Sequence, residues 1–123
     1  MTTVLLVEDE VDLAELIAEA LEDEGLEAAT ATSDVDAYAA LEARAKDFAV
    51  LIADINLGVG TTGFDVARRA RQLNRALKVV YITGQSAQMG RFGVEDGVMF
   101  PKPFNASELA QRVKALLEQP ATG

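Results

Sequence analysis

Short apolar runs alternate along the chain with segments in which apolar residues recur every three or four positions. The runs predict strands, and the periodic segments predict helices. The strands are expected at residues 4–7, 26–31, 48–53, 77–82 and 98–100. The helices are expected at residues 13–21, 33–44, 64–74 and 105–117. Residues 84–97 contain four glycines, so any helix in that segment is expected to be short.

The ends of the predicted helices carry residues typical of caps. Gly25 follows the first helix and predicts its end, and Ser33 or Asp34 is placed to cap the second. Asn105 precedes the last helix, with Glu108 three residues later, close to the pattern of a capping box. These signals support the helix boundaries that the apolar spacing indicates.

A strand followed by a helix occurs five times, which predicts an α/β protein with a parallel sheet covered by helices on both faces. The run 48–53 is apolar at every position, as expected for a strand buried on both sides. Pro101 has no N–H to donate, so the strand at 98–100 is expected at an edge of the sheet. We expect one domain over residues 1–119 and a frayed tail at 120–123.

Composition narrows the possible functions. Half of the 123 residues are apolar, which is sufficient for a core, and Cys, His and Trp are absent. Without Cys or His, the chain has no zinc site of the usual ligands, no disulfide, no thiol nucleophile and no histidine-based triad. No apolar run approaches the length of a membrane span, so we expect a soluble, cytoplasmic protein that does not bind membranes.

The charge is concentrated at one end of the chain. The net charge is −9, and residues 1–25 hold nine acidic residues and no basic one. The rest of the chain is neutral overall. This balance argues against nucleic acid as a direct partner.

Polar residues that suit a phosphoryl-transfer site follow four of the five predicted strands. In open α/β sheets, ligands bind beyond the carboxyl ends of the strands. The residues at those positions are Glu8 and Asp9, Asp54, Thr83, and Lys102. Three acids, one hydroxyl and one ammonium group are therefore expected at the same edge of the sheet.

These residue types suit a Mg²⁺-assisted phosphoryl site. Carboxylates of Glu8, Asp9 and Asp54, with the backbone carbonyl of Asn56, provide the oxygen ligands that Mg²⁺ prefers. A carboxylate can attack phosphorus and form an acyl phosphate. Lys102 and Thr83 are placed to hold the phosphoryl oxygens by charge and by a hydrogen bond.

The motifs resemble the receiver domain of two-component response regulators over nearly the whole chain. They are Glu8-Asp9, Asp54, Thr83-Gly84 and Lys102-Pro103-Phe104. The resemblance implies a bacterial, flavodoxin-like (βα)5 domain with strand order 2-1-3-4-5. It also implies that Asp54 is the phosphoacceptor, that Thr83 and Lys102 assist, and that Glu8, Asp9, Asp54 and the Asn56 carbonyl bind Mg²⁺.

The resemblance further implies the partners. The phosphoryl donor would be a histidine kinase or a histidine phosphotransfer protein, and a downstream protein target would respond through altered contacts. The first helix is a candidate docking surface for the donor. We expect a single-domain regulator that is a monomer or weak dimer, and that catalyses only its own phosphorylation and dephosphorylation.

Two segments depart from the common pattern of the family. The usual aromatic switch residue lies three positions before the lysine, where this chain has Met99, and the ring is at Phe100 instead. Because side chains alternate along a strand, Phe100 is expected on the opposite face from Met99. In the loop after Asp54, Leu57-Gly58 replaces Met-Pro, and Gly63 lies nine residues on rather than eight. The segment 81–84 resembles the Phe-Ala-Thr-Gly motif of the FATGUY group of single-domain receivers.

Three other interpretations remain open at this point. Residues 58–63 spell G-x-G-x-x-G, but they do not follow the strand directly and lack the acidic residue that binds the ribose. A Mg²⁺-dependent phosphatase with an Asp nucleophile would have a second acid two residues after Asp54, where this chain has Asn56. A degenerate receiver that binds partners without phosphorylation is disfavoured by the presence of Asp54, Thr83 and Lys102.

Overall fold

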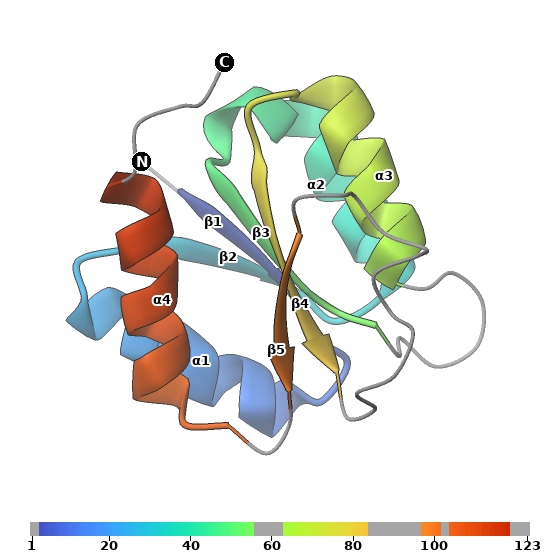
Figure 1. The fold of residues 1–123 in the computed structure, drawn as a ribbon. Helices are drawn as coiled ribbons and strands as arrows, with labels where there is room; N and C mark the ends of the chain where they lie inside the picture. The colour runs from blue at the N-terminus through green and yellow to red at the C-terminus, as the bar shows by residue number, and fades with distance from the viewer. Residues whose placement is uncertain (1–2, 56–62, 84–96, 102–103, 119–123) are drawn as a thin grey trace.

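Five parallel strands form one sheet in the order β2-β1-β3-β4-β5 (Figure 1). The computed structural model describes residues 3–55, 63–83, 97–101 and 104–118. The strands are β1 (Val4–Val7), β2 (Ala28–Ala31), β3 (Val50–Asp54), β4 (Lys78–Thr83) and β5 (Val98–Pro101). The strand order and the parallel sheet confirm the predicted fold class.

Helices cover both faces of the sheet. They are α1 (Val11–Asp23), α2 (Asp34–Arg44), α3 (Gly63–Leu73) and α4 (Ala106–Glu118), with a short 3₁₀ turn, η1 (Ala45–Asp47). Figure 1 shows α1 and α4 on one side of the sheet and α2 and α3 on the other. The short helix expected within residues 84–97 lies outside the described part of the chain.

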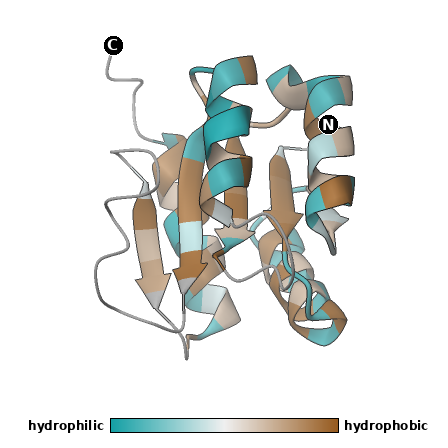
Figure 2. Cartoon of the chain, turned by 90° about the vertical axis from the view of Figure 1, so that its right-hand side faces the viewer, coloured by the Kyte–Doolittle hydropathy of each residue, from teal (hydrophilic) through white to brown (hydrophobic). Residues whose placement is uncertain are grey.

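Side-chain alternation along the strands divides the core into two layers. Leu5, Leu51 and Tyr81 point to the α2/α3 side, where they pack with Leu41 and Val66. Their neighbours in sequence point to the α1/α4 side, where Leu6, Ile52 and Ile82 pack with Ile17 and Leu109. The strands are accordingly mostly apolar on both faces, and most of the polar residues lie on the helices (Figure 2).

The predicted helix ends are confirmed by their hydrogen bonds. The Asp36 N–H donates to Ser33 Oγ at 3.1 Å, and the Ser107 N–H donates to Asn105 Oδ1 at 2.8 Å. Gly25 has a φ of 81°, a left-handed conformation that L side chains rarely adopt. Its N–H donates to the Glu22 carbonyl at 2.9 Å and so ends α1.

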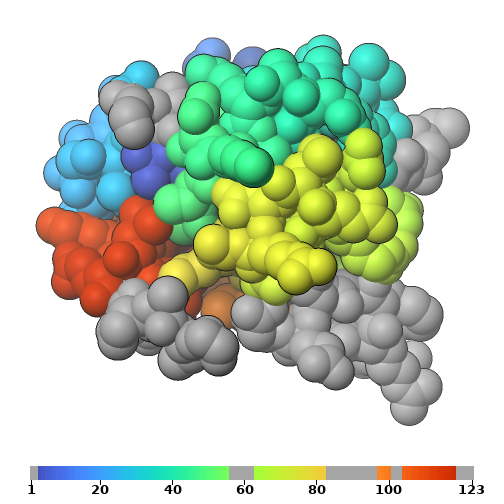
Figure 3. All heavy atoms as spheres, turned by 90° about the horizontal axis from the view of Figure 1, so that it is seen from above, coloured from blue at the N-terminus to red at the C-terminus, as the bar shows by residue number. Residues whose placement is uncertain are grey.

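Strand β3 begins two residues later than the apolar pattern predicts. Phe48 is 2% exposed but precedes the strand, because it is the residue that follows η1 and ends that turn. Asn74 fixes this connection, since its Nδ2 donates to the carbonyls of Ala45 and Phe48, each at 3.0 Å. Figure 3 shows this end of the molecule, where the green segment around η1 meets the yellow segment after α3.

The position of β5 confirms the prediction from Pro101. β5 pairs with β4 alone and forms one edge of the sheet, with Pro101 in register with Thr83. Among the residues that the structure describes, no helix is both long enough and apolar enough to span a membrane.

Candidate functional site

Strands β1 and β3 are neighbours and end at the same edge of the sheet. Val7 is in register with Ala53, so Glu8 and Asp54 follow the paired residues side by side. Carboxylate oxygens of Glu8, Asp9 and Asp54 lie within 4.8 Å of one another. The parallel register therefore brings together acids that are 45 or more residues apart in the sequence.

The three acids differ in their exposure to solvent. Glu8 is 0% exposed and Asp54 is 3% exposed, whereas Asp9 is exposed. The Glu8 N–H donates to the Ala31 carbonyl at 3.0 Å, which extends the pairing of β1 with β2 by one residue. Glu8 Oε1 accepts from the Glu10 N–H at 3.2 Å. The backbone thus fixes Glu8 within the sheet and leaves Asp9 at the surface of the site.

A cluster of this kind fits a hard divalent cation. Carboxylates at such short separations repel one another, and burial strengthens the repulsion because water screens it less. A small cation with oxygen ligands relieves that repulsion, and Mg²⁺ is commonly bound by one or two carboxylates with waters and phosphate oxygens. The donor set of Glu8, Asp9 and Asp54 fits Mg²⁺ on these chemical grounds.

The structure describes only part of the predicted site. Thr83 is the last residue of β4, at the edge where Asp54 ends β3, and Asp54 is in register with Ile82. Lys102 and Asn56 lie outside the described residues. The described residues therefore place Glu8, Asp9, Asp54 and the backbone of Thr83 at one edge of the sheet.

Helix α3 begins directly against the backbone of Asp54. The Gly63 N–H donates to the Ile55 carbonyl at 3.1 Å, and Gly63 is buried. In the sequence, Gly63 stands out for its spacing from Asp54 and as the last glycine of the G-x-G-x-x-G segment. Neither feature reveals which backbone the glycine contacts.

Met99 and Phe100 lie on opposite faces of the sheet, as the alternation predicts. Met99 packs against the core layer on the α2/α3 side. Phe100 packs against the layer on the α1/α4 side, where its ring meets that of Phe104 edge to face at 5.5 Å. The ring is therefore part of the packing beneath α1 and α4.

The fold and the acidic edge define the class of protein. A doubly wound, flavodoxin-like sheet carries clustered acids at the carboxyl ends of β1 and β3. Residues 4–114 match the response regulator receiver domain family, and the chain belongs to that family. It is a receiver domain of two-component signal transduction, a signalling switch whose family is typically phosphorylated on aspartate with Mg²⁺.

Curated bacterial relatives support this assignment over nearly all of the chain. The phosphate regulon transcriptional regulatory protein PhoB of Pseudomonas aeruginosa is 33% identical over 126 residues, which cover 98% of this chain and 54% of PhoB. The probable transcriptional regulatory protein TcrX of Mycobacterium tuberculosis is 36% identical over 122 residues, which cover 95% of this chain and 50% of TcrX. The chain spans about half the length of the curated relatives it matches.

Solved structures show the same fold. A response regulator receiver protein from Sinorhizobium medicae has a TM-score of 0.86 and 31% identity, with 94% of both chains covered. The response regulator TrrA from Thermotoga maritima, solved in complex with Mg(2+)-BeF, has a TM-score of 0.77 and 29% identity, with coverage of 94% of this chain and 99% of TrrA.

Proposed function

We propose that this receiver domain accepts a phosphoryl group on Asp54 in a Mg²⁺-dependent reaction and then changes its protein contacts. The observation that carries the proposal is the convergence of Glu8, Asp9 and Asp54 at the carboxyl edge of the sheet. The phosphoryl donor is a histidine kinase or a histidine phosphotransfer protein. A related protein, TrrA, has been solved in complex with Mg(2+)-BeF, which supports the proposed use of Mg²⁺.

The position of Asp54 supports its role as the acceptor. It ends the central strand β3, with the acids after β1 on one side and the end of β4 on the other. Mg²⁺ held by Glu8, Asp9, Asp54 and the Asn56 carbonyl would supply positive charge next to the transferred group. β4, which ends at Thr83, is the strand next to β3, and we assign the Thr83 hydroxyl to the phosphoryl oxygens.

The chemical step is a transfer of one phosphoryl group. A carboxylate oxygen of Asp54 forms a bond to phosphorus as the bond between phosphorus and the donor's leaving atom breaks, and an acyl phosphate results. Lys102 and Thr83 hold the phosphoryl oxygens as the charge shifts. The acceptor is a residue of the chain itself, so the domain promotes its own phosphorylation and dephosphorylation and does not turn over an external substrate.

Helix α1 is the proposed docking surface for the phosphodonor. Its outer face carries acidic side chains and the apolar side chains of Val11 and Leu16, each 54% exposed. A groove between α1 and the start of α4 is lined by Leu16, Glu19 and Asp23 on one side and by Phe104 on the other. A partner helix with one apolar residue flanked by basic residues fits this groove by charge and by apolar contact.

The remaining partner and the location follow from the acidic charge of the domain and from the donor. The downstream target is a protein, and nucleic acid is not a direct partner of this acidic domain. A cytoplasmic location follows from the proposed kinase partner.

Intact-mass spectrometry with a small acyl-phosphate donor tests the proposal. We expect the native chain to gain one phosphoryl group with Mg²⁺ and none with chelator. Asp54→Asn should gain none, while Asp47→Asn, an exposed acid in η1, should behave as the native chain does. Labelling of folded Asp54→Asn at the native rate would reassign the acceptor. If the native chain neither binds Mg²⁺ nor takes up a phosphoryl group, the alternative of a degenerate receiver that binds partners without phosphorylation is favoured.

Charge reversal on α1 tests the docking surface separately. With a cognate phosphodonor in hand, Glu19→Lys should slow transfer from that protein and leave labelling by the small donor unchanged. Asp47→Lys, at the exposed acid in η1, is the matched control. Equal transfer rates in both variants would place the docking surface elsewhere.

A further inference from the structure

The first residue of α3 lies too close to the phosphoacceptor strand to carry a side chain. A Cβ atom on Gly63 would be 2.9 Å from the carbonyl carbon of Asp54 and 3.1 Å from Ile55 Cα, and closer still to the Asp54 carbonyl oxygen. All three neighbours are backbone atoms, so no flexible side chain can move aside. Gly63 does not have a left-handed φ. Space, and not backbone freedom, therefore requires glycine at this position.

The strand side of this contact is fixed by the sheet. Asp54 is in register with Ile82, and the Ile55 N–H donates to the Ile82 carbonyl at 3.0 Å. β3 also pairs with β1 on its other side. The peptide that follows Asp54 is thus tied to the neighbouring strand at the point where Gly63 meets it.

The helix side of the contact is also fixed. The Phe64 ring, 6% exposed, packs edge to face on the buried ring of Tyr81 in β4, with centroids 4.9 Å apart. Val66, Ala67 and Ala70 anchor the same helix in the core. A side chain on Gly63 would therefore have to displace either the backbone of Asp54 or a well-packed helix.

We infer that Gly63 is a positioning residue for the phosphoryl transfer. Its missing side chain lets α3 lie directly against the Asp54 peptide, which sets the direction in which the Asp54 carboxylate points toward Glu8 and Asp9. This inference rests on the proposed role of Asp54 as the acceptor. A misplacement of about 1 Å in a reacting group can cost about a hundredfold in rate, so a small backbone shift is enough to matter.

The test compares two glycine substitutions in the full chain. Gly63→Ala introduces the clash at Asp54. Gly25→Ala is the matched control, because Gly25 has a φ of +81° and no atom within 4 Å of its Cβ position, so its cost is backbone strain far from the site. The maximal rate of phosphoryl labelling is measured at saturating Mg²⁺ and small acyl-phosphate donor, together with urea unfolding of each variant.

We expect Gly63→Ala to lower the maximal rate by about tenfold to a hundredfold. Gly25→Ala should lose stability and keep the native rate. The same rate loss in both variants would show that stability alone sets the rate, which overturns the inference. Native-rate labelling of folded Gly63→Ala would overturn it as well, while leaving the proposed function intact. A native chain that cannot be labelled would overturn both.

A second variant covers the case in which Gly63→Ala does not fold. Phe64→Leu keeps Gly63 but removes the ring that holds α3 against Tyr81. We expect a slower maximal rate, by about threefold to tenfold, because the start of α3 is less firmly held against Asp54. A folded Phe64→Leu chain with the native rate would overturn the inference.

Discussion

Asp54 and Glu8 are buried carboxylates, and their oxygens lie within 4.8 Å of one another and of a carboxylate oxygen of Asp9. Burial of like charges is unfavourable, because the repulsion is poorly screened and each charge loses hydration. The fold tolerates this arrangement at the ends of two strands that are otherwise fully apolar. The site therefore reduces the stability of the metal-free chain, and neutralising one of its charges should recover part of that loss.

Asp54→Asn is predicted to stabilise the metal-free chain. The substitution keeps the shape of the side chain and removes one of three repelling charges, which should raise the free energy of unfolding by about 1 kcal/mol. Urea unfolding in the presence of chelator measures this change in the free energy of unfolding. Asp47→Asn, at an exposed acid outside the cluster, should change the free energy of unfolding little. A less stable Asp54→Asn chain would show that contacts of the carboxylate outweigh the repulsion.

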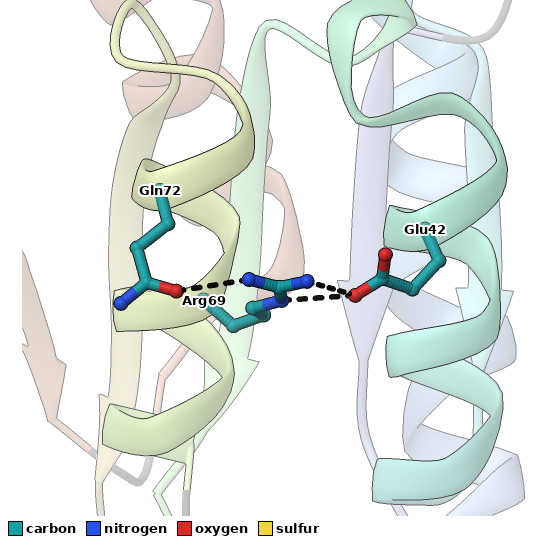
Figure 4. A network of polar contacts seen from close by, with 3 residues as sticks. All are labelled: Glu42, Arg69 and Gln72. Carbon is teal, nitrogen blue, oxygen red and sulfur yellow. Dashed lines mark hydrogen bonds and ion pairs between the residues drawn. The ribbon is translucent and has the colours of Figure 1, made fainter.

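At the scale of elements, α3 connects the acceptor strand to the rest of the α2/α3 layer. Its first residue, Gly63, lies against the backbone of Asp54. Its middle is joined to α2 by Arg69, which donates to Glu42 Oε1 from Nε at 2.9 Å and from Nη2 at 2.6 Å. Arg69 also donates to Gln72 (Figure 4). Arg69 and Glu42 are 40% and 53% exposed, so this ion pair contributes at most about 1 kcal/mol.

The residue after α3 makes the stronger connection. Asn74 donates to the carbonyls of Ala45 and Phe48, and its Oδ1 accepts from the Ala76 N–H at 3.1 Å. Asn74→Ala should lower the free energy of unfolding by about 2–3 kcal/mol, since partly buried carbonyls lose their donor. Asn74→Asp should be at least as destabilising, because it places a carboxylate against two carbonyls. Urea unfolding measures both, and Arg75→Ala, an exposed neighbour, is the control.

Strand β5 gives a second prediction at this scale. Phe100 packs on Phe104 and on the α1/α4 layer, so Phe100→Leu should lower the free energy of unfolding by about 1 kcal/mol and leave the maximal labelling rate unchanged. Met99→Leu, a substitution of similar volume on the other face, should cost less. A Phe100→Leu chain of native stability that fails to signal to its target would contradict this packing role.

At the scale of the whole molecule, metal binding and folding are linked. A ligand that binds the folded chain and not the unfolded chain stabilises it in proportion to the logarithm of its concentration. The cluster of Glu8, Asp9 and Asp54 exists only in the folded state, because the sheet brings β1 and β3 together. Mg²⁺ should therefore raise the stability of the entire domain.

The predicted gain is about 2.7 kcal/mol in the free energy of unfolding when Mg²⁺ is at a hundred times its Kd. Asp9→Ala should weaken this dependence, because it removes the exposed ligand while leaving the buried pair in place. Asp12→Ala, an exposed acid in the first turn of α1 outside the cluster, is the control. Urea unfolding across a Mg²⁺ titration measures the effect. An unchanged titration in Asp9→Ala would reassign the metal site.

Much of the fold follows from patterns that are local in the sequence. Alternating apolar runs and helical spacing predicted the five strands and the four described helices, and cap residues such as Ser33 and Asn105 predicted helix starts. The start of β3 was predicted two residues early, because Phe48 is as apolar as a strand residue but belongs to the connection from η1. Hydrophobicity reports burial, and burial is common to strands and to well-packed connections.

The sequence by itself determined that Glu8, Asp9 and Asp54 stand at one edge of the sheet. The carboxyl ends of parallel strands lie at the same edge, and these acids stand at the carboxyl ends of their strands. It also determined that Met99 and Phe100 lie on opposite faces of the sheet, because side chains alternate between the two faces along a strand. The tertiary structure alone decided that Gly63 lies against Asp54 and that Asn74 donates to Ala45 and Phe48. Those contacts depend on how a helix packs on a sheet, and side-chain spacing along one element carries no information about the backbone of another.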